Sequence, residues 1–335
     1  MRDGTIRDAM ELRPVDSLEV CVLVDNALDI LSSVPDGVTS EIPNIRKAGA
    51  KELAGSCLCC AAWGLSLVIT TRVGDESHTM LFDAGPEDYA LERNGRRLGI
   101  DFGAIECVAL SHGHFDHAGG LPTALRLIRD ANGGRSVPMH VNAGMFGKRA
   151  FQPPDADRFP LGHVPTPDEL RGAGGDVISS DAARTVLADT VYVSGEIPRV
   201  TDYEKGLPAQ VRQLDDGTWV PDPLVLDERF LAVHVKQRGM VVFSACSHAG
   251  IVNVLRSARD VFEPPLYAAI GGLHLSGKTH EAIIPDTVRD LGELDLTRIV
   301  AGHCTGWRAL HALVHTFGDV VVPGAVGQVH RFGAS

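Results

Sequence analysis

Hydrophobic and polar positions alternate along the chain in short blocks, which predicts many brief strands separated by turns. The first apolar run of strand length ends at the turn signal Asp25-Asn26. Gly74-Asp75-Glu76 separates two further apolar runs and therefore predicts a hairpin. The strands expected in the first third of the chain are Leu18–Val24, Leu65–Thr71, Thr79–Phe82 and Cys107–Leu110.

In the second half of the chain, strand patterns alternate with helical ones. Strands are expected at Val191–Val193, Arg229–Lys236, Met240–Phe243, Leu266–Ile270, Ile299–Gly302 and Val320–Val322. Helices are expected at Leu121–Ile128, Val252–Phe262, Glu281–Leu291 and Gly306–Phe317. Strands that pair as neighbours, followed by strands that alternate with helices, predict an α/β (α+β) chain with two helix-covered sheets.

Two segments lack a clear periodic pattern. Residues 36–54 are polar and predict irregular structure. Residues from about 151 to 185 are rich in proline, glycine and aspartate, which predicts a loop or a short irregular helix. Because long loops are uncommon unless they cover a site, we expect a lid-like insertion within a single domain spanning residues 1–335.

The composition narrows the class of partner and the compartment. A formal net charge of −12 disfavours a nucleic-acid partner, because such proteins usually present a basic face. No apolar stretch approaches the roughly 18 residues that a membrane helix needs, and Met1–Asp16 lacks the apolar core of a signal peptide. Seven cysteines are too few for a disulfide scaffold of this size. We therefore expect a cytoplasmic protein that binds an anionic small molecule and no membrane.

The strongest chemical signal is a cluster of four potential metal ligands directly after a predicted strand. His112, His114, Asp116 and His117 stand at spacings of two, two and one, which chance would give on the order of once in a thousand chains. Residues two apart in extended chain point the same way, so His112 and His114 can share one metal. Asp116 and His117 enter the following helix and can serve a second metal. Imidazole and carboxylate ligands suit zinc, with manganese or iron as alternatives.

Two later histidines follow predicted strands and complete the expected set of metal ligands. His248 and His303 each lie just past a buried strand, where open sheets place functional groups. His274 has the same context, but it would overfill the ligand set, so we expect a proton donor or a substrate contact. Cys246, two residues before His248, is either a neighbour of the metals or a buried thiol.

Three cations are candidates for binding an anionic substrate group, the alternative being exposed surface charge: Lys148, Arg149 and Arg199. His140 is not expected to be a ligand. The pair His311 and His315 has zincin spacing but lacks the glutamate that would serve as general base. The chain contains neither a phosphate-binding P-loop nor a nucleophile elbow, so those chemistries are not predicted.

The run from Ser111 to Leu121 closely resembles the signature of the metallo-β-lactamase superfamily. The upstream segment Leu81–Gly85 resembles the strand and turn that precede this signature, in which Asp83 would support the metal site. The resemblance implies a four-layer αββα sandwich with a dinuclear metal site at one edge of the sheets.

A narrower resemblance runs from about residue 18 to the end of the chain. It points to the branch named for the dihydropterin-methyl-ribofuranosylaminobenzene phosphate synthases of methanopterin biosynthesis. Most hydrolases of the superfamily carry a bridging aspartate at a place that Ser244–His248 occupies here. The segments that carry this narrower resemblance are Leu23–Asn26, Trp63–Ser66, Gly195–Arg199, Cys246–Asn253, Gly271–Leu275 and His303–Gly306.

These observations predict a metal-dependent hydrolase, or a phosphate-ester transferase or synthase, that acts on a phosphorylated or pterin-like small molecule. Two divalent metals would polarise a phosphoryl or ester oxygen, and Asp116 and His274 are the expected catalytic residues. The alternatives are a non-catalytic metal-binding module for sensing or assembly, and a nuclease-type phosphodiesterase.

Overall fold

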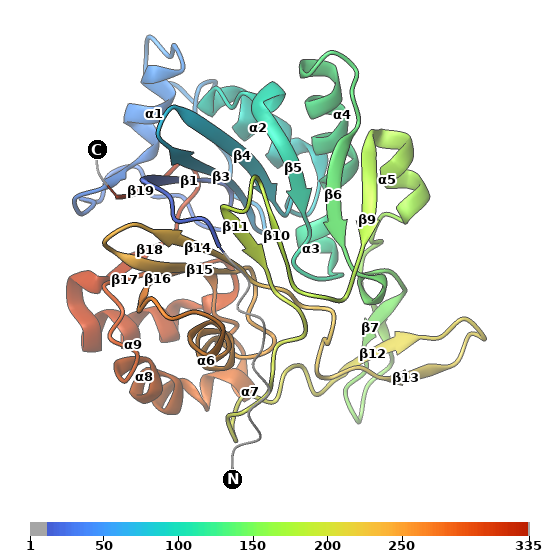
Figure 1. Ribbon diagram of the computed structural model, residues 1–335. Helices are drawn as coiled ribbons and strands as arrows, with labels where there is room; N and C mark the ends of the chain where they lie inside the picture. Colours follow the sequence, from blue (N-terminus) through green and yellow to red (C-terminus); the bar gives the residue numbers. More distant parts are fainter. Residues whose placement is uncertain (1–11, 334–335) are drawn as a thin grey trace.

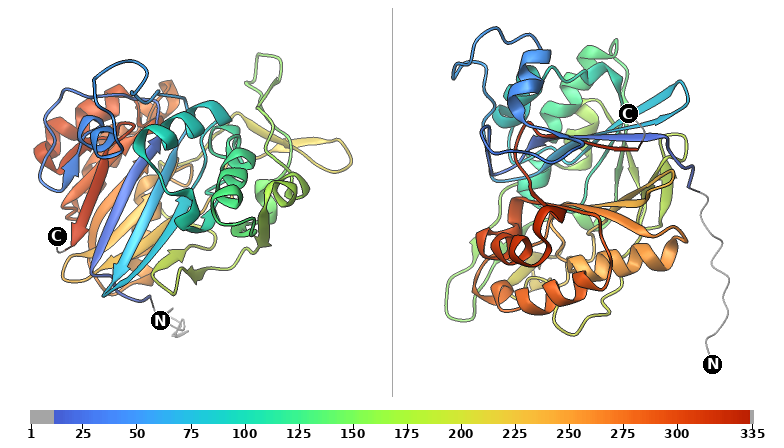
Figure 2. Two further views of the ribbon diagram at one scale, coloured as in Figure 1. Left: turned by 90° about the horizontal axis from the view of Figure 1, so that it is seen from above. Right: turned by 90° about the vertical axis from the view of Figure 1, so that its left-hand side faces the viewer.

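The computed structural model describes residues 12–333, and its elements form four layers. Two β-sheets pack face to face, and helices cover the outer face of each sheet (Figure 1; Figure 2, right). One hydrophobic cluster fills the space between the sheets, and two more lie between each sheet and its helices. The αββα sandwich expected from the sequence is therefore confirmed.

The first sheet has the strand order β2-β19-β1-β3-β4-β5-β6-β9. Its strands run antiparallel from β2 to β4 and parallel from β4 to β9. The polar turn with the four candidate ligands follows β5. The strands are β1 (Ser17–Val24), β2 (Val38–Thr39), β3 (Ser66–Val73), β4 (Glu76–Phe82), β5 (Ile105–Ala109), β6 (Val137–Val141), β9 (Gly175–Ser179) and β19 (Val329–Gly333).

The second sheet has the order β10-β11-β14-β15-β16-β17-β18 and becomes parallel from β15 onward. Because parallel strands end at the same edge, β15, β16 and β17 deliver their following residues to one place. The strands are β10 (Arg184–Val186), β11 (Val191–Val193), β14 (Leu231–Val235), β15 (Gly239–Ser244), β16 (Leu266–Gly272), β17 (Arg298–Gly302) and β18 (Val321–Pro323).

Alternation along the strands explains the layers. In β4, Met80 and Phe82 belong to the cluster between the sheets, whereas Leu81 packs beneath the outer helices. The helices of the first layer include α1 (Glu41–Lys47), α2 (Asp88–Leu98), α3 (Phe115–Ala118), α4 (Leu121–Ala131) and α5 (Pro167–Ala173), and those of the fourth are α6 (Ile251–Val261), α7 (Lys278–Glu281), α8 (Ile284–Gly292) and α9 (Trp307–Phe317).

Two predicted elements differ in the structure. The segment 36–54, predicted to be irregular, contains β2 and α1. The single helix predicted for Glu281–Leu291 is divided into α7 and α8, with Pro285 in the first turn of α8. Proline lacks a backbone N–H and its ring excludes the preceding helical turn, so a helix begins there more easily than it continues.

The segment from 151 to 185 is more regular than its composition predicted. Thr166 and Glu169 form a capping box that begins α5, and the chain then enters β9, which pairs in parallel with β6. Residues 152–160 are exposed, and Gly162 lies against Phe115 of the metal motif, where an added Cβ would be 2.9 Å from its side chain. A lid within a single domain stays a prediction for this segment.

A small third sheet stands beside the sandwich, at the right in Figure 1. Its strands are β7 (Arg149–Phe151), β8 (Phe159–Pro160), β12 (Gln210–Gln213) and β13 (Trp219–Pro221). No helix among residues 12–333 has the length and apolar character to cross a bilayer. The prediction that Met1–Asp16 lacks the apolar core of a signal peptide concerns mainly residues 1–11, which lie outside the described range.

Candidate metal centre

Strand ends from both sheets bring the predicted ligands together in one buried cluster. The motif after β5 meets His248 after β15 and His303 after β17. The ring centroids of His112 and His248 are 4.7 Å apart, and those of His117 and His303 are 5.0 Å apart. The ligand atoms fall into two neighbouring sets, each within 4.8 Å: a first group of His112, His114 and His248, and a second group of Asp116, His117 and His303.

The first group directs three imidazole nitrogens at one point. His112 Nε2 lies 3.0 Å from His114 Nδ1 and 3.1 Å from His248 Nε2. The Ser111 hydroxyl donates to Asp83, so it accepts from His112 Nδ1–H at 2.8 Å. His114 Nε2–H in turn donates to Gln210 Oε1 at 2.7 Å. Both histidines therefore face each other with lone pairs, an arrangement that a cation between them would stabilise.

The orientation of Gln210 in this network is set by its other contacts. Its amide nitrogen donates to the backbone and the carboxylate of Asp222, each at 3.2 Å, which leaves Oε1 for His114. Gln210 lies on β12 of the small sheet, so this sheet takes part in the centre. No sequence pattern indicated this role, because a glutamine on a short polar strand resembles an ordinary surface residue.

The second group combines a carboxylate with two imidazoles. His117 Nδ1–H donates to Asp83 at 2.7 Å, so its Nε2 carries a lone pair. That Nε2 is buried and has no hydrogen-bond partner within residues 12–333. Asp116 Oδ2 lies 3.9 Å from it and 3.5 Å from His303 Nε2. An unpartnered buried lone pair beside a carboxylate fits a divalent cation.

The electrostatics of the cluster keep the first group in the neutral form that binds metals. Burial holds the pKa values of His112 and His248 well below their usual range and lowers the pKa of His114 to about 3. Burial also lowers the pKa of His117, but the carboxylates of Asp116 and Asp83 outweigh it and raise that pKa above its usual value. Asp116 is the one carboxylate of the two groups, so the second group is the one that offers a negatively charged ligand.

Three buried carboxylates hold the turns that carry the candidate ligands. Asp83 accepts from the backbone N–H of Ser111 at 2.7 Å. Glu228 accepts from the N–H groups of His248 and Ala249 at 2.8 and 2.6 Å. Asp25 accepts from the N–H of His303 at 3.1 Å. His303 has a φ of 47°, which L-residues rarely adopt. Apart from Asp83, this supporting role was not foreseen from the sequence.

His274 lies beside the first group, as expected. Its ring centroid is 4.4 Å from that of His248, and its Nδ1 lies 3.5 Å from the Sγ of Cys246. Together with His280 these histidines line a small cavity of about 20 Å³. Burial lowers the pKa of His274 to about 3. The position suits a substrate contact, and the catalytic role stays a prediction.

The three predicted substrate cations have different environments. Arg149 is 6% exposed, and its guanidinium donates to the carbonyl of Gly113 at 2.6 Å and to Asp222 and Asp227 at 3.1 and 2.5 Å. It therefore positions the ligand-bearing turn instead of offering a free charge.

Arg199 is partly buried and donates to two backbone carbonyls, whereas Lys148 is exposed. Contact of Lys148, Arg149 or Arg199 with substrate stays a prediction. For Arg149 the structure argues against such contact, because its guanidinium is already hydrogen-bonded within the protein.

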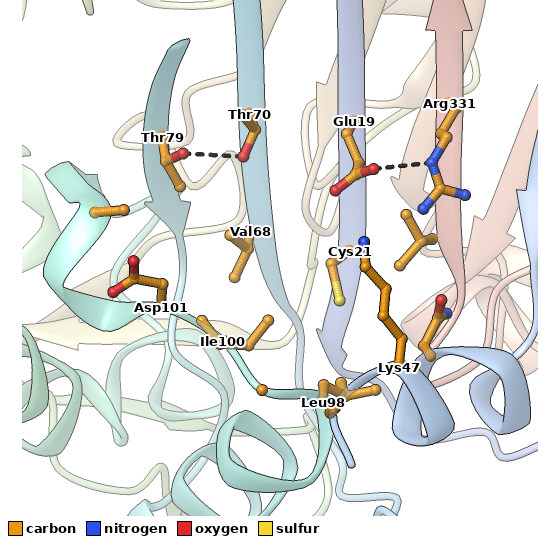
Figure 3. A pocket seen from close by; sticks show the side chains of 15 residues that line it. Glu19, Cys21, Lys47, Val68, Thr70, Thr79, Leu98, Ile100, Asp101 and Arg331 are labelled. Carbon is orange, nitrogen blue, oxygen red and sulfur yellow. Dashed lines mark hydrogen bonds and ion pairs between the residues drawn. The ribbon is translucent and has the colours of Figure 1, made fainter. Parts of the chain in front are cut away.

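Larger cavities lie away from the centre. One of about 300 Å³ opens on the outer face of the first sheet, lined by strand residues and by Lys47 of α1 (Figure 3). Four of its polar side chains are already paired, Glu19 with Arg331 and Thr70 with Thr79 (Figure 3). This cavity shares no lining residue with the two metal-ligand groups.

Comparisons with known proteins agree with this geometry. Residues 64–200 match the family model described as "Metallo-beta-lactamase superfamily". The chain is 28% identical over 273 residues to the 7,8-dihydropterin-6-methyl-4-(beta-D-ribofuranosyl)-aminobenzene-5'-phosphate synthase of Methanocaldococcus jannaschii, which covers 80% of this chain and 90% of that enzyme. An uncharacterized protein of the same organism is also 28% identical, over 75% of this chain and 87% of that protein.

Solved structures show the same fold. A metal-dependent hydrolase of the beta-lactamase superfamily superposes with a TM-score of 0.67 at 22% identity, over 95% of this chain and 99% of that one. The metallo-beta-lactamase fold protein YhfI from Bacillus subtilis gives 0.50 at 12% identity, over 95% and 100% of the two chains. Residues 64–200, which include the sequence signature, thus match the metallo-β-lactamase superfamily model, the chain shares the layers of solved metallo-β-lactamase-fold structures, and over most of its length it is similar to the phosphate synthase of Methanocaldococcus jannaschii.

Proposed function

We propose that this protein is a metal-dependent hydrolase, or a phosphate-ester transferase or synthase, that acts on a phosphorylated or pterin-like small molecule. The first and second groups would each hold one divalent transition metal, zinc foremost, with manganese or iron as alternatives. The observation that carries the proposal is the convergence of imidazole lone pairs from His112, His114 and His117 in one buried space. All seven cysteines are free, which agrees with the reducing cytoplasm included in the proposal.

The residues have distinct parts in the proposed mechanism. Two bound metals supply a Lewis acid for a phosphoryl or ester oxygen and an activated water or an oriented leaving group. Asp83 holds His112 and His117 in the tautomers that present Nε2, through Ser111 and directly. His274, whose Nδ1 lies 3.5 Å from the Sγ of Cys246, would give or take a proton at Nε2 from a substrate bound beside the first group.

An aromatic side chain at the rim suits a planar substrate. Trp63 is 52% exposed, and its ring centroid lies 5.4 Å from that of His303. The chain is held tightly there, because a Cβ at Gly64 would lie 2.2 Å from the carbonyl oxygen of Asp116. An exposed indole on a closely packed backbone beside the second group offers a stacking surface for a pterin-like ring.

The similarity to the synthase supports the phosphorylated, pterin-like substrate class. The alternatives are a metal-binding module without turnover and a nuclease-type phosphodiesterase. The complete ligand sets argue against the first, and the net charge of −12 argues against the second.

A two-step experiment tests the proposal. Elemental analysis after reconstitution with zinc, manganese or iron should give up to about two metals per chain. The loaded protein is then assayed with a generic phosphodiester, with single-stranded nucleic acid, and for condensation of a dihydropterin methyl diphosphate with a phosphorylated ribofuranosylaminobenzene. Turnover of a small molecule supports the proposal. Absence of metal overturns it, metal without turnover favours the binding module, and preferred cleavage of nucleic acid favours the nuclease.

A further inference from the structure

A sulfur atom lies between the two metal-ligand groups. Cys246 follows β15 and is 3% exposed. Its Sγ lies within 4.8 Å of ligand nitrogens of both His112 and His117, which belong to the first and the second group respectively. Among residues 12–333, this is the candidate ligand set that contains a residue of each group.

A second sulfur supports the first. Cys304, next to His303, has its Sγ 3.0 Å from the Sγ of Cys246. Space for this contact depends on Gly272 at the end of β16, because a Cβ there would lie 2.6 Å from the Sγ of Cys304. Three strand ends of the second sheet thus cooperate to place a pair of thiols against the metal-ligand groups.

We propose that the Cys246 thiolate is a metal ligand shared by the two groups, an inference that rests on the proposed function. On metal loading the Cys246 thiol loses its proton to solvent, and its sulfur forms bonds to the metals while no other covalent bond breaks. Cys304 keeps its proton and donates an S–H hydrogen bond to the Cys246 sulfur.

The shared sulfur determines which metals the centre prefers. Thiolates are soft ligands that favour zinc, iron and cobalt over magnesium and calcium. A centre of imidazoles and carboxylate alone would discriminate less against manganese. The inference therefore adds a metal preference to the proposed function: zinc, iron(II) or cobalt(II) should bind in competition with an excess of manganese.

Cobalt substitution and X-ray absorption test the inference without any activity assay. In cobalt-loaded protein, a near-ultraviolet thiolate-to-cobalt charge-transfer band is expected, and zinc-loaded protein should show a sulfur scatterer at about 2.3 Å from the metal. Cys246→Ser should lose both signals, whereas Cys304→Ser should keep them. Cys107→Ser is the matched control, since Cys107 is equally buried but lies on β5 within the core between the sheets.

Each result decides the inference. Sulfur in the wild-type metal shell that disappears in Cys246→Ser supports it. If that variant does not fold, sulfur that persists in Cys304→Ser supports the inference, and sulfur that is lost in Cys304→Ser overturns it. Metals bound with nitrogen and oxygen ligands alone overturn the inference and leave the proposed function standing. A disulfide between Cys246 and Cys304 in metal-loaded protein, detected as the loss of two hydrogens by mass spectrometry, also overturns it. Failure to bind any metal overturns both.

Discussion

The two sheets contribute to the metal centre in different ways. The first sheet provides four candidate ligands within six consecutive residues, 112–117, after the single strand β5. The second sheet provides single residues after separate parallel strands, His248 after β15 and His303 after β17. The ligands of the first sheet are close together in the sequence. Those of the second sheet are brought together only when the parallel strands pair in the folded protein.

The supports of the two contributions differ as well. Asp83 acts on side chains as well as on the backbone N–H of Ser111, since it also accepts from the Ser111 hydroxyl and from His117 Nδ1 and so fixes tautomers. Glu228 and Asp25 act on backbone N–H groups of the turns at His248 and His303. The ligands after β5 therefore have a support that fixes which nitrogen would face a metal, whereas the ligands after β15 and β17 have supports, Glu228 before β14 and Asp25 after β1, that position their turns.

The largest effect is expected from removing a ligand of either group. His112→Ala should lower metal content from about two to about one per chain by emptying the first group, and Asp116→Ala should empty the second. Turnover should be lost in both. His140→Ala is the control, because it changes a half-buried histidine on β6 outside both groups. Unchanged metal content in either variant would contradict the assignment, as measured by elemental analysis.

A smaller effect should separate the two kinds of support. Asp83→Asn changes a group that fixes tautomers, so metal affinity should fall by about 10- to 100-fold. Glu228→Gln keeps one acceptor for the turn at His248. The fall in metal affinity should therefore be smaller than for Asp83→Asn and confined to the first group. Competition with a chelator measures both affinities. Equal losses at both groups in the two variants would show that the supports do not divide in this way.

A still smaller effect is expected at Trp63, whose exposed ring lies beside that of His303 in the second group. Trp63→Ala should raise the KM for a pterin-like substrate by about tenfold, with kcat and metal content nearly unchanged, because the change removes a stacking surface and leaves His303, whose ring lies beside the indole, in place. Trp307→Ala is the matched control, since Trp307 is also exposed, at 70%, and instead contacts Arg308. A fall in kcat with constant KM would argue against a stacking role.

How far the sequence predicts the centre follows from the same contrast. The motif 112–117 could be identified because its residues are neighbours in the chain. His248 and His303 could be predicted as ligands because each follows a recognisable apolar strand, although their assignment stays a prediction. Glu228 gave no signal, because its partners are backbone amides 20 residues further on. Contacts of that kind are created by the fold and leave no pattern in composition or spacing.

The fold shows the same limit. Strands with long apolar runs, such as β15 and β16, were predicted within a few residues of their bounds. Helix α1 was missed because it buries few side chains, so its apolar periodicity is weak. Strand β9 was missed because it is short and mostly exposed. The capping box at Thr166 and Glu169 was a readable start signal for α5 that the high proline content obscured.

The smallest effect concerns acid stability, and it contrasts a buried histidine of the first sheet with a partly exposed one of the second, both outside the two ligand groups. His330 on β19 is 1% exposed, and neither ring nitrogen finds a hydrogen-bond partner among the described residues. Burial lowers its pKa to about 3. Below about pH 6.5 the imidazole of His330 therefore binds a proton in the unfolded chain but stays neutral in the folded chain. Stability from this residue is complete above that pH and is lost as the pH falls toward 3.

His330→Leu should remove this proton uptake, so the variant should lose less stability than wild type between pH 6.5 and 4, by on the order of 2 kcal/mol. His234→Leu on β14 of the second sheet is the control, because His234 is partly exposed and burial lowers its pKa less completely. Denaturant unfolding of metal-free protein at several pH values measures the difference and keeps acid release of metal out of the comparison. Parallel pH profiles for wild type and His330→Leu would mean that His330 is protonated in the folded state, and that the first sheet opens there at acidic pH.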